Sequence, residues 1–398
     1  MPVTSFMASA QSVEISKTQN FLKELKQTPL YNYHIEKGGK MVPFDGWSMP
    51  VYYANQSVLS EHIHTREYAL LFDILHMLQF KILGKDCIRF LESLVVANIE
   101  EMPLGSSVLS VLTNENGGII DDNVICKHAN HLYVVSNAAC ADKDLAHVRT
   151  KMGEFQKKAV GYYISNISIL YLTNLIIFYN KGPLAAEILR KLCDKDLSDF
   201  MFMTARFLHV KTIESHVSRS GYTGEDGFEI SVAATSAQRL AKLILGYPSV
   251  HFAGLGARDS LRLEAGLCLY GHDLDNSITP VEAGLSWTIG KCRRVDGGFL
   301  GANRILSQFK GGVARRRVGL TIEGALAKEN AEIYNSDDEL IGKVTSGGPS
   351  PTLNKNIAME YIKSGYHKSG TLLKVKVRNK LQDAKIVKMP FVPSRYHK

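Results

Sequence analysis

The chain has 398 residues, of which 45% are hydrophobic and 22% charged, a composition typical of globular domains and unlike that of disordered or collagen-like chains. That length is enough for two or three domains. The net charge of +8 favours acidic partners. The basic runs at 291–294 and 315–317 lack interleaved aromatic residues, so no nucleic-acid partner is expected.

The cysteines and the apolar stretches indicate a reducing compartment without a membrane. No two of the six cysteines have C-x-x-C spacing, and several stand in apolar runs, which favours reduced, buried thiols over disulfides or a zinc site. The longest apolar stretch, 164–178, contains Ser, Asn and Thr and is shorter than the ~20 apolar residues that a membrane helix needs. Residues 1–27 hold no arginine and are predicted to be a disordered leader.

The next part of the chain, up to about Trp287, mixes helical and strand patterns. Hydrophobic periodicity and helix-start signals predict helices and strands in this region. The predicted helices span 58–69, 86–96, 141–152, 183–192, 236–245 and 257–265, and the clearest strands are 71–74 and 132–136. This region therefore contains both helices and strands.

The pattern changes after about Gly301. Short apolar runs at 318–322, 341–344, 372–377 and 386–387 are separated by Gly, Asn, Asp and Pro. This is typical of an all-β domain. We place the domain boundary between about 290 and 312, with a region 28–290 before it and a β domain over 291–398.

The segment TNENGGIIDDNV (113–124) is the most informative one. Asn116-Gly117-Gly118 predicts a tight turn, and the apolar residues after it predict a strand that carries two adjacent carboxylates. Aspartate is disfavoured in strands, and burying two has a desolvation cost. Because strand side chains alternate, Asp121 and Asp122 face opposite ways, so one can enter a cavity while the other meets solvent or accepts from a backbone donor. The alternative is a solvated strand end.

GYTGEDGFEI (221–230) combines glycines, acids and aromatic residues in a loop that leads into a strand. Tyr222 offers a flat face with a polar tip. A carboxylate at Glu229 can accept two hydrogen bonds from a donor–donor edge, such as that of a pterin. The alternative is a glycine-rich hairpin with exposed acids.

Arg258 and Arg262 lie one turn apart on the predicted helix 257–265 and can bind a ligand carboxylate. The alternative, for at least one of them, is an ion pair with Glu264 or Asp273.

Other candidates have weaker signals. Trp47 and Trp287 stand in places where an aromatic residue is more often part of the core than a ligand platform. His62 and His64 are two positions apart on a predicted helix and do not share a face, so we expect no metal site there. His76 is a weak candidate base.

Taken together, eight blocks of the chain resemble the T protein of the glycine cleavage system, the tetrahydrofolate-dependent aminomethyltransferase family. They are TPLYNYH (28–34), KMVPFDGWSMPVYY (40–53), TNENGGIIDD (113–122), GYTGEDGFEI (221–230), GARDSLRLEAGLCLYG (256–271), PVEAGLSWTIGK (280–291), VTSGGPSPTL (344–353) and KMPFVP (388–393). The resemblance runs from about residue 28 to the end and follows the family in order and spacing.

The resemblance implies a three-domain cloverleaf with a central folate channel, in which two interleaved α+β domains precede a β-barrel-like domain. It implies transfer of an aminomethyl group from the dihydrolipoyl arm of the lipoylated H protein to tetrahydrofolate, which releases ammonia and gives 5,10-methylenetetrahydrofolate. It also implies a monomer in the mitochondrial matrix, although residues 1–27 make a weak leader.

The resemblance also implies roles for single residues. Asp122 becomes the catalytic carboxylate that orients and deprotonates the folate amine. Glu229 binds the pterin edge, Tyr222 packs against the folate, and Arg258 anchors the ligand. Further positions near the cleft are Asn137, Trp287, Arg317 and Tyr396.

Two departures from the family pattern stand out. DILHM has Leu75 where the family has serine, and the segment 165–182 is longer than the family pattern and of uncertain local folding. Two alternative functions stay open: the folate-binding half of a dimethylglycine or sarcosine dehydrogenase, and a folate-binding iron–sulfur assembly factor. The chain lacks the flavin domain of the first. It lacks the cysteine that the second carries near 221–230.

Overall fold

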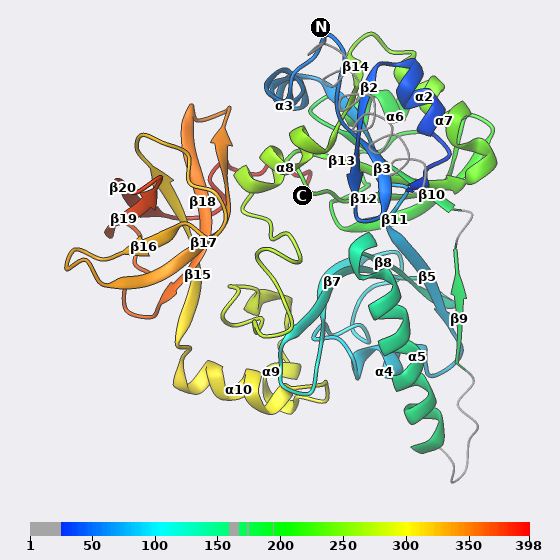
Figure 1. Ribbon diagram of the computed structural model, residues 1–398. Coiled ribbons are helices and arrows are strands. Elements are labelled where there is room, and N and C mark those ends of the chain that lie inside the picture. The colour runs from blue at the N-terminus through cyan, green and yellow to red at the C-terminus, as the bar shows by residue number, and fades with distance from the viewer. Residues whose placement is uncertain (1–24, 159–166, 173–174, 194) are drawn as a thin grey trace, which may run out of the picture.

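The structure is a computed structural model that describes residues 25–158, 167–172, 175–193 and 195–398. The chain forms three lobes, and its C-terminus lies between them (Figure 1). The predicted leader falls mostly on residues 1–24, which lie outside the described residues.

The first lobe contains a six-stranded sheet of order β11-β12-β13-β10-β4-β14, in which only β14 and β4 pair in parallel. Its strands are β4 (Ala69–Asp73), β10 (Leu175–Lys181), β11 (Thr204–Val210), β12 (Ile213–Arg219), β13 (Gly227–Ala233) and β14 (Val250–Ala253). A small sheet of order β1-β3-β2 joins it, with β1 (Lys26–Gln27), β2 (Gly39–Phe44) and β3 (Trp47–Tyr53). The helices of this lobe are α2 (Tyr31–Glu36), α3 (Val58–Glu67), α6 (Ala185–Cys193), η2 (Ala234–Ser236), α7 (Ala237–Leu245) and α8 (Leu255–Glu264).

The second lobe is built on an antiparallel five-stranded sheet of order β6-β7-β8-β5-β9. Its elements are β5 (Leu78–Leu83), α4 (Cys87–Glu92), β6 (Ser107–Thr113), β7 (Ile119–Lys127), β8 (His131–Ser136), η1 (Ala138–Cys140), α5 (Ala141–Lys158) and β9 (Ser168–Tyr171). The chain leaves the six-stranded sheet after β4, forms this second sheet, and returns to the first sheet in β10. The two sheets are therefore interleaved along the sequence.

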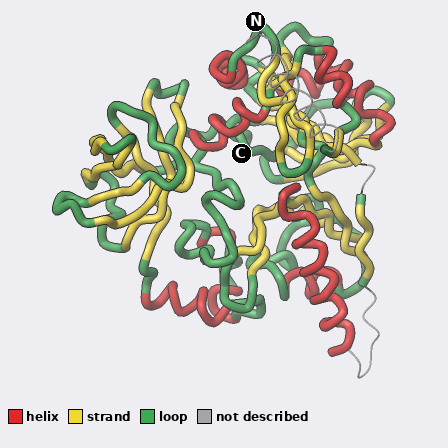
Figure 2. The backbone as a smooth tube through the Cα atoms, viewed as in Figure 1, coloured by secondary structure: helices red, strands yellow, loops and turns green. Residues whose placement is uncertain are grey.

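The third lobe is a closed barrel of order β15-β18-β17-β16-β19-β20. Its strands are β15 (Arg315–Ile322), β16 (Glu332–Tyr334), β17 (Leu340–Ser350), β18 (Lys355–Lys363), β19 (Leu372–Val377) and β20 (Lys380–Val387). The elements η3 (Ser286–Thr288), α9 (Arg293–Asp296) and α10 (Ala302–Gly311) lead into it. Strands and loops make up the barrel, whereas most helices cover the other two lobes (Figure 2). The predicted α+β fold with a C-terminal β barrel is confirmed, and the exact domain limits stay a prediction.

Most predicted helices form within a few residues of their expected limits. Helix α3 begins at the predicted residue because the Ser57 side chain accepts a hydrogen bond from the Ser60 backbone N–H, as an N-cap does. The helix predicted over 86–96 was too long, because α4 ends at Glu92. Val95 is buried and pairs with Leu112 of β6, so contact with the sheet overrides the helical periodicity.

The lengthened segment 165–182 contributes to both sheets where it is described. Strand β9 pairs with β5 of the second lobe, and β10 lies between β13 and β4 of the first. Leu75, the other departure, is buried in the core of the first lobe, and its backbone N–H donates to Asp73 Oδ1 at 2.8 Å.

Candidate active site

A cavity of about 670 Å³ lies where the three lobes meet. Strands β6, β7, β8 and β13, helix α8, the loops after it, β15 and the C-terminal segment all contribute to its wall. The wall contains every predicted site residue: Asp122, Asn137, Tyr222, Glu229, Arg258, Trp287, Arg317 and Tyr396. Residues that are up to 274 positions apart in the sequence therefore line one space.

The Asp-Asp pair adopts the alternating arrangement expected of a strand. The Gly117 backbone has the positive φ of the predicted turn, at 74°, and β7 follows. Asp122 lines the cavity, whereas Asp121 is fully buried and accepts a hydrogen bond from the Asn137 backbone N–H at 3.0 Å. The Asn137 amide donates to both carboxylates, at 2.9 Å to Asp121 Oδ1 and 2.9 Å to Asp122 Oδ1. Asn137 therefore fixes the orientation of Asp122.

Burial and the neighbouring Asp121 charge raise the pKa of Asp122 to about 7, although the hydrogen bond from Asn137 and the positive charge of Arg258 oppose the shift. A carboxyl group with a pKa near neutrality can both accept and return a proton at physiological pH. Asp122 is therefore suited to acid–base chemistry.

Sequence reasoning missed Asp144, which lies behind the pair in the first turn of α5. Its carboxylate is fully buried and belongs to a group with Asp121 and Cys140 whose polar atoms lie within 4.8 Å of one another. Burial and Asp121 raise the pKa of Asp144 to about 10. An acid in a first helical turn is usually a solvated partner of the helix dipole, so the local sequence pattern does not indicate a buried acid at this position.

Tyr222 and Arg258 form one side of the cavity together. The Arg258 guanidinium lies over the Tyr222 ring, 4.6 Å from its centroid. The Tyr222 hydroxyl donates to the Cys268 carbonyl, which holds the ring in place. Burial raises the pKa of Tyr222, so the hydroxyl stays neutral. The pair offers a flat face with a positive charge beside it.

Glu229 stands in the middle of β13 and is buried. The solvated hairpin considered for this segment is thus excluded for Glu229. A buried carboxylate needs donors around it, and its cavity-facing position lets a ligand supply some of them.

The remaining predicted residues lie around the cavity on other elements. Trp287, in η3, is 60% exposed and is not a core residue. The Tyr396 ring stacks on Phe202, with their centroids 3.9 Å apart. Arg317 donates to the Ala283 and Gly266 carbonyls at 2.8 and 3.0 Å, so part of its role is to hold the loops after α8 against the barrel.

Arg262 has a structural role instead of the binding role considered for it. Its guanidinium is buried and donates to Asp273 Oδ2 at 2.8 Å and to Asp259 Oδ1 at 2.8 Å. The intramolecular ion pair considered for this helix is therefore correct for Arg262, although it also involves Asp259.

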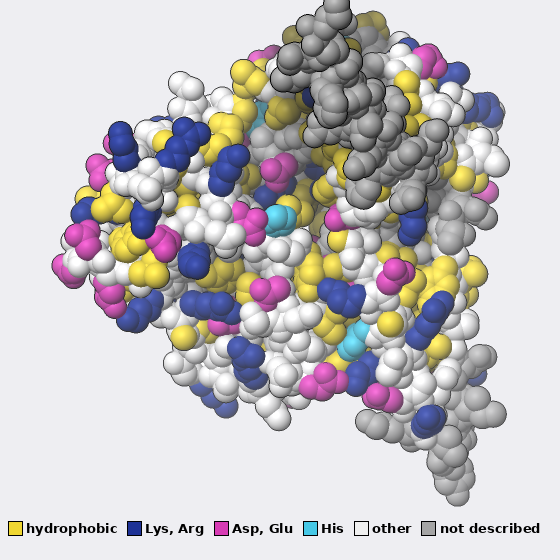
Figure 3. All heavy atoms as spheres, viewed as in Figure 1, with side chains coloured by type: hydrophobic (Ala, Val, Ile, Leu, Met, Phe, Trp, Pro, Cys, Tyr) yellow, Lys and Arg dark blue, Asp and Glu magenta, His cyan; other side chains and the backbone are white. Residues whose placement is uncertain are grey.

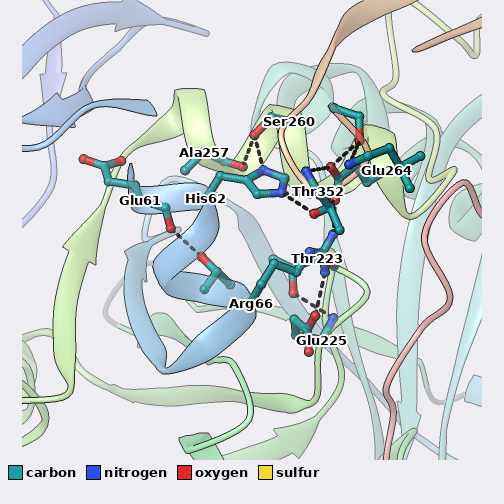
Figure 4. Close-up of polar contacts among 12 residues, drawn as sticks. Glu61, His62, Arg66, Thr223, Glu225, Ala257, Ser260, Glu264 and Thr352 are labelled. Carbon is teal, nitrogen blue, oxygen red and sulfur yellow. Dashed lines mark hydrogen bonds and ion pairs between the residues drawn. The ribbon is translucent and has the colours of Figure 1, made fainter. Parts of the chain in front are cut away.

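His62 is likewise part of a buried network that joins α3, α8 and the barrel (Figure 4). Its Nδ1 lies 2.7 Å from Ser260 Oγ, and its Nε2 lies 3.1 Å from Glu264 Oε2. Arg66 donates to Glu264 Oε2 at 2.7 Å and to Glu225 Oε1 at 2.8 Å. The ring of His62 thus has protein partners on both nitrogens and needs no metal.

His76 lies outside the residues that line the cavity. Burial lowers its pKa to about 4, which makes it a poor base at neutral pH.

All six cysteines are free, five of them buried, as predicted.

Comparison with known families matches nearly the whole chain. The GCVT N-terminal domain matches residues 30–293, and the glycine cleavage T-protein C-terminal barrel domain matches residues 315–393. The chain belongs to the glycine cleavage T-protein family.

Within the described residues, no helix has both the length and the apolar character for a membrane crossing.

Curated relatives from plants and mammals align over almost their full length. The mitochondrial aminomethyltransferase of Flaveria anomala is 51% identical over 94% of this chain and 91% of its own length. Those of Mus musculus and Homo sapiens are each 49% identical, over 97% and 94% of this chain and 94% and 91% of their own lengths. These relatives are named as mitochondrial, which agrees with the predicted location.

A solved structure shares the fold. The glycine cleavage system aminomethyltransferase T of Bartonella henselae is 35% identical, with a TM-score of 0.86 over 94% of this chain and 100% of that one.

Proposed function

We propose that this protein is a mitochondrial aminomethyltransferase of the glycine cleavage system, with tetrahydrofolate as its co-substrate. It takes the aminomethyl group from the dihydrolipoyl arm of the H protein, releases ammonia and forms 5,10-methylenetetrahydrofolate. The observation that carries the proposal is the convergence of all eight predicted residues on one cavity, with a carboxyl group of pKa about 7 among them. The full-length relatives named aminomethyltransferase support the same reaction.

The cavity suits tetrahydrofolate in size and chemistry. Its volume of about 670 Å³ falls in the range of about 300–1,000 Å³ of small-molecule sites. The buried Glu229 carboxylate is complementary to the donor edge of a pterin, and the Tyr222 ring is a surface on which a flat ring can pack. Arg258 supplies a cation for a carboxylate.

Asp122 performs the proton chemistry in this proposal. As ammonia leaves, the negative charge of the carboxylate stabilises the positive charge that develops on the transferred carbon. The carboxylate then accepts the proton of the folate amine that attacks this carbon. Asn137 keeps the carboxylate aimed into the cavity. Trp287, exposed at the cavity wall, is placed to meet the incoming lipoyl arm.

The charge of the chain supports an acidic partner and an anionic substrate. The net charge is +8. On the face drawn in Figure 3, lysine and arginine side chains are spread among acidic ones and do not gather in one patch. Long-range attraction of an acidic H protein therefore comes from the overall charge. We expect the protein to act as a monomer.

The direct test is an assay of the purified full-length chain with tetrahydrofolate and aminomethylated H protein. We expect ammonia release that depends on both substrates. Absence of ammonia release by a folded chain that binds tetrahydrofolate would refute the proposed reaction. It would leave folate binding without transfer, as the assembly-factor alternative requires.

The pterin assignment has a separate test in Glu229→Ala. Loss of charge-assisted hydrogen bonds of about 1.5–3 kcal/mol should weaken tetrahydrofolate binding by roughly 10- to 150-fold, as measured by fluorescence titration. Glu214→Ala, at an exposed position on the neighbouring strand β12, is the control and should bind normally. An unchanged dissociation constant in Glu229→Ala would remove Glu229 from the pterin site.

A further inference from the structure

A second cluster of polar side chains lies away from Asp122, where the two interleaved sheets adjoin. Cys126 is on β7 of the five-stranded sheet, His128 follows that strand, and His216 is on β12 of the six-stranded sheet. The three residues offer one sulfur and two imidazole nitrogens that all lie within 4.8 Å of one another. Thiolate and imidazole are the ligands that zinc prefers.

Two of the three distances within the cluster are close to those of a metal centre. His128 Nε2 lies 3.1 Å from His216 Nε2 and 3.4 Å from Cys126 Sγ. A tetrahedral zinc site has metal–nitrogen bonds of about 2.0–2.1 Å and metal–sulfur bonds of about 2.3 Å. In such a site two nitrogen ligands lie about 3.3 Å apart, and a nitrogen and a sulfur ligand lie about 3.6 Å apart. The ligand atoms of Cys126 and His216 lie within 4.8 Å of each other. A small movement of these two side chains would bring the three atoms to a common ion.

The surroundings hold the ligands in place and leave room beside them. Cys126 is 2% exposed and His216 is 9% exposed. The His216 ring packs edge-on against Tyr133, with centroids 4.7 Å apart, and the His131 ring stacks on His128 at 4.7 Å. A cavity of about 10 Å³, enough for about one water-sized particle, touches both Cys126 and His216.

The charges near the cluster determine which ions fit. Lys81 is close enough to affect the charge of both His128 and His216, and its positive charge opposes cation binding. A bound cysteine thiolate offsets one positive charge of the metal. The set of one thiolate and two neutral imidazoles favours zinc over hard cations such as magnesium or calcium, which prefer oxygen.

We propose that Cys126, His128 and His216 form a three-ligand site for Zn²⁺ that links the two sheets, with a water molecule as the fourth ligand. This site lies beyond the transferase reaction and differs from the sequence expectation of no metal. The sequence did not indicate it because His216 is 90 positions from Cys126, so no short spacing motif exists. The ion would cross-link two separate sheets, and none of its three ligands is among the residues that line the large cavity.

The test uses the purified full-length chain, stripped with a chelator and then titrated with Zn²⁺ against a chromophoric competitor. We expect one equivalent to bind, and Zn²⁺ to raise the thermal unfolding midpoint because it binds the folded state. Cys126→Ser should weaken binding at least about 100-fold, since loss of even an outer partner of a metal ligand costs about 10–100-fold. Cys193→Ser, which alters another buried free thiol, is the matched control and should bind as the wild type does.

Titration with Co²⁺ shows whether sulfur is a ligand. A thiolate-to-cobalt charge-transfer band should appear in the wild type and in Cys193→Ser and be absent from Cys126→Ser. His128→Gln, at a half-buried turn position, tests the same site should Cys126→Ser fail to fold. Failure of the wild type to bind one equivalent, or wild-type affinity in both ligand variants, would overturn the proposal. The cluster would then be a hydrogen-bonded histidine pair beside a thiol.

Discussion

Asp122 and Glu264 are two acidic residues at the contacts between lobes, and their surroundings differ in the number of donors. Glu264, the last residue of α8, is fully buried and accepts from Arg66, His62, Ser350 and Thr352. These partners outweigh the effect of burial and lower its pKa to about 2. Glu264 is therefore always ionised at physiological pH.

Asp122 has a different environment. Within the described part of the chain, its side-chain hydrogen-bond donor is the Asn137 amide, which it shares with Asp121, and the charge of Asp121 repels its own. Burial then dominates, and the pKa of Asp122 rises to about 7. A carboxyl group thus holds the lobes together where hydrogen-bond donors are abundant, and it can exchange a proton where such donors are scarce.

The largest expected effect is on turnover in Asp122→Asn. The amide keeps the shape of the side chain but cannot accept a proton from the substrate amine. We expect ammonia release to fall at least about 100-fold, the low end for a positioned acid or base, with tetrahydrofolate affinity nearly unchanged. Asp337→Asn, at an exposed position on the barrel, is the control. Turnover near the wild-type rate in Asp122→Asn would exclude Asp122 from the mechanism.

The second effect concerns stability and tests the other side of the comparison. Glu264→Gln removes the charge that compensates Arg66 in a buried network, which should lower the free energy of unfolding by about 3 kcal/mol. Urea denaturation at pH 7 measures this change. Glu339→Gln removes an exposed pair with Lys363 and should change stability by less than about 1 kcal/mol. Equal values for the two variants would contradict the network interpretation.

Stability should also depend on pH through Glu264. Its folded pKa lies below the ordinary value of 4.5, so its contribution is present above about pH 4.5 and is lost as pH falls toward about 2. In Glu264→Gln this part of the acid dependence should be missing.

The sequence indicated the Asp121-Asp122 pair because its signal is local: a turn, a strand and two adjacent acids are all visible in twelve residues. The choice of Asp122 came from the family resemblance. The roles of Tyr222 and Glu229 were likewise suggested by one short segment. Arg258 and Arg262 show the limit of such reasoning. They lie on one helix, and their residue types and spacing alone do not show which of them pairs within the protein. The resemblance named Arg258 as the ligand anchor, and the structure shows that Arg262 pairs with Asp273 while Arg258 lines the cavity.

Features that depend on contacts distant in sequence were not predictable. Asp144 reads as an ordinary acid in a first helical turn, yet it is buried behind Asp121. The helix predicted over 86–96 follows its own periodicity, but pairing with β6 ends it early. In each case the deciding neighbour lies elsewhere in the chain, so the local pattern carries no information on it.

The third effect is on the stability of Asp122→Asn. Its free energy of unfolding should rise, whereas that of Glu264→Gln should fall. The folded pKa of Asp122 is raised above its ordinary value of 3.8, so the wild type loses stability as pH rises from about 4 to about 7. Asp122→Asn lacks this loss and should be more stable than the wild type by at least about 1 kcal/mol at pH 8, given about 1.4 kcal/mol per unit of pKa shift. Urea denaturation at pH 5 and pH 8 should show a larger gain at pH 8. A variant less stable than the wild type at pH 8 would indicate that Asp122 is held by favourable contacts, as Glu264 is.

The smallest effect should come from Asn137→Ala, which removes the donor that the two aspartates share. Without it the carboxylate of Asp122 is less stabilised and its pKa rises further. Since Asp122 must be deprotonated to act as a base, kcat/KM falls below about pH 7 in the wild type, and this acid limb should move up by about half a unit to one unit in the variant. Asn130→Ala, at an exposed position before β8, should leave the limb in place. A lower kcat/KM with the acid limb at its wild-type pH would mean that Asn137 orients the Asp122 carboxylate but does not affect its pKa. The scarcity of hydrogen-bond donors would then not account for the raised pKa of Asp122.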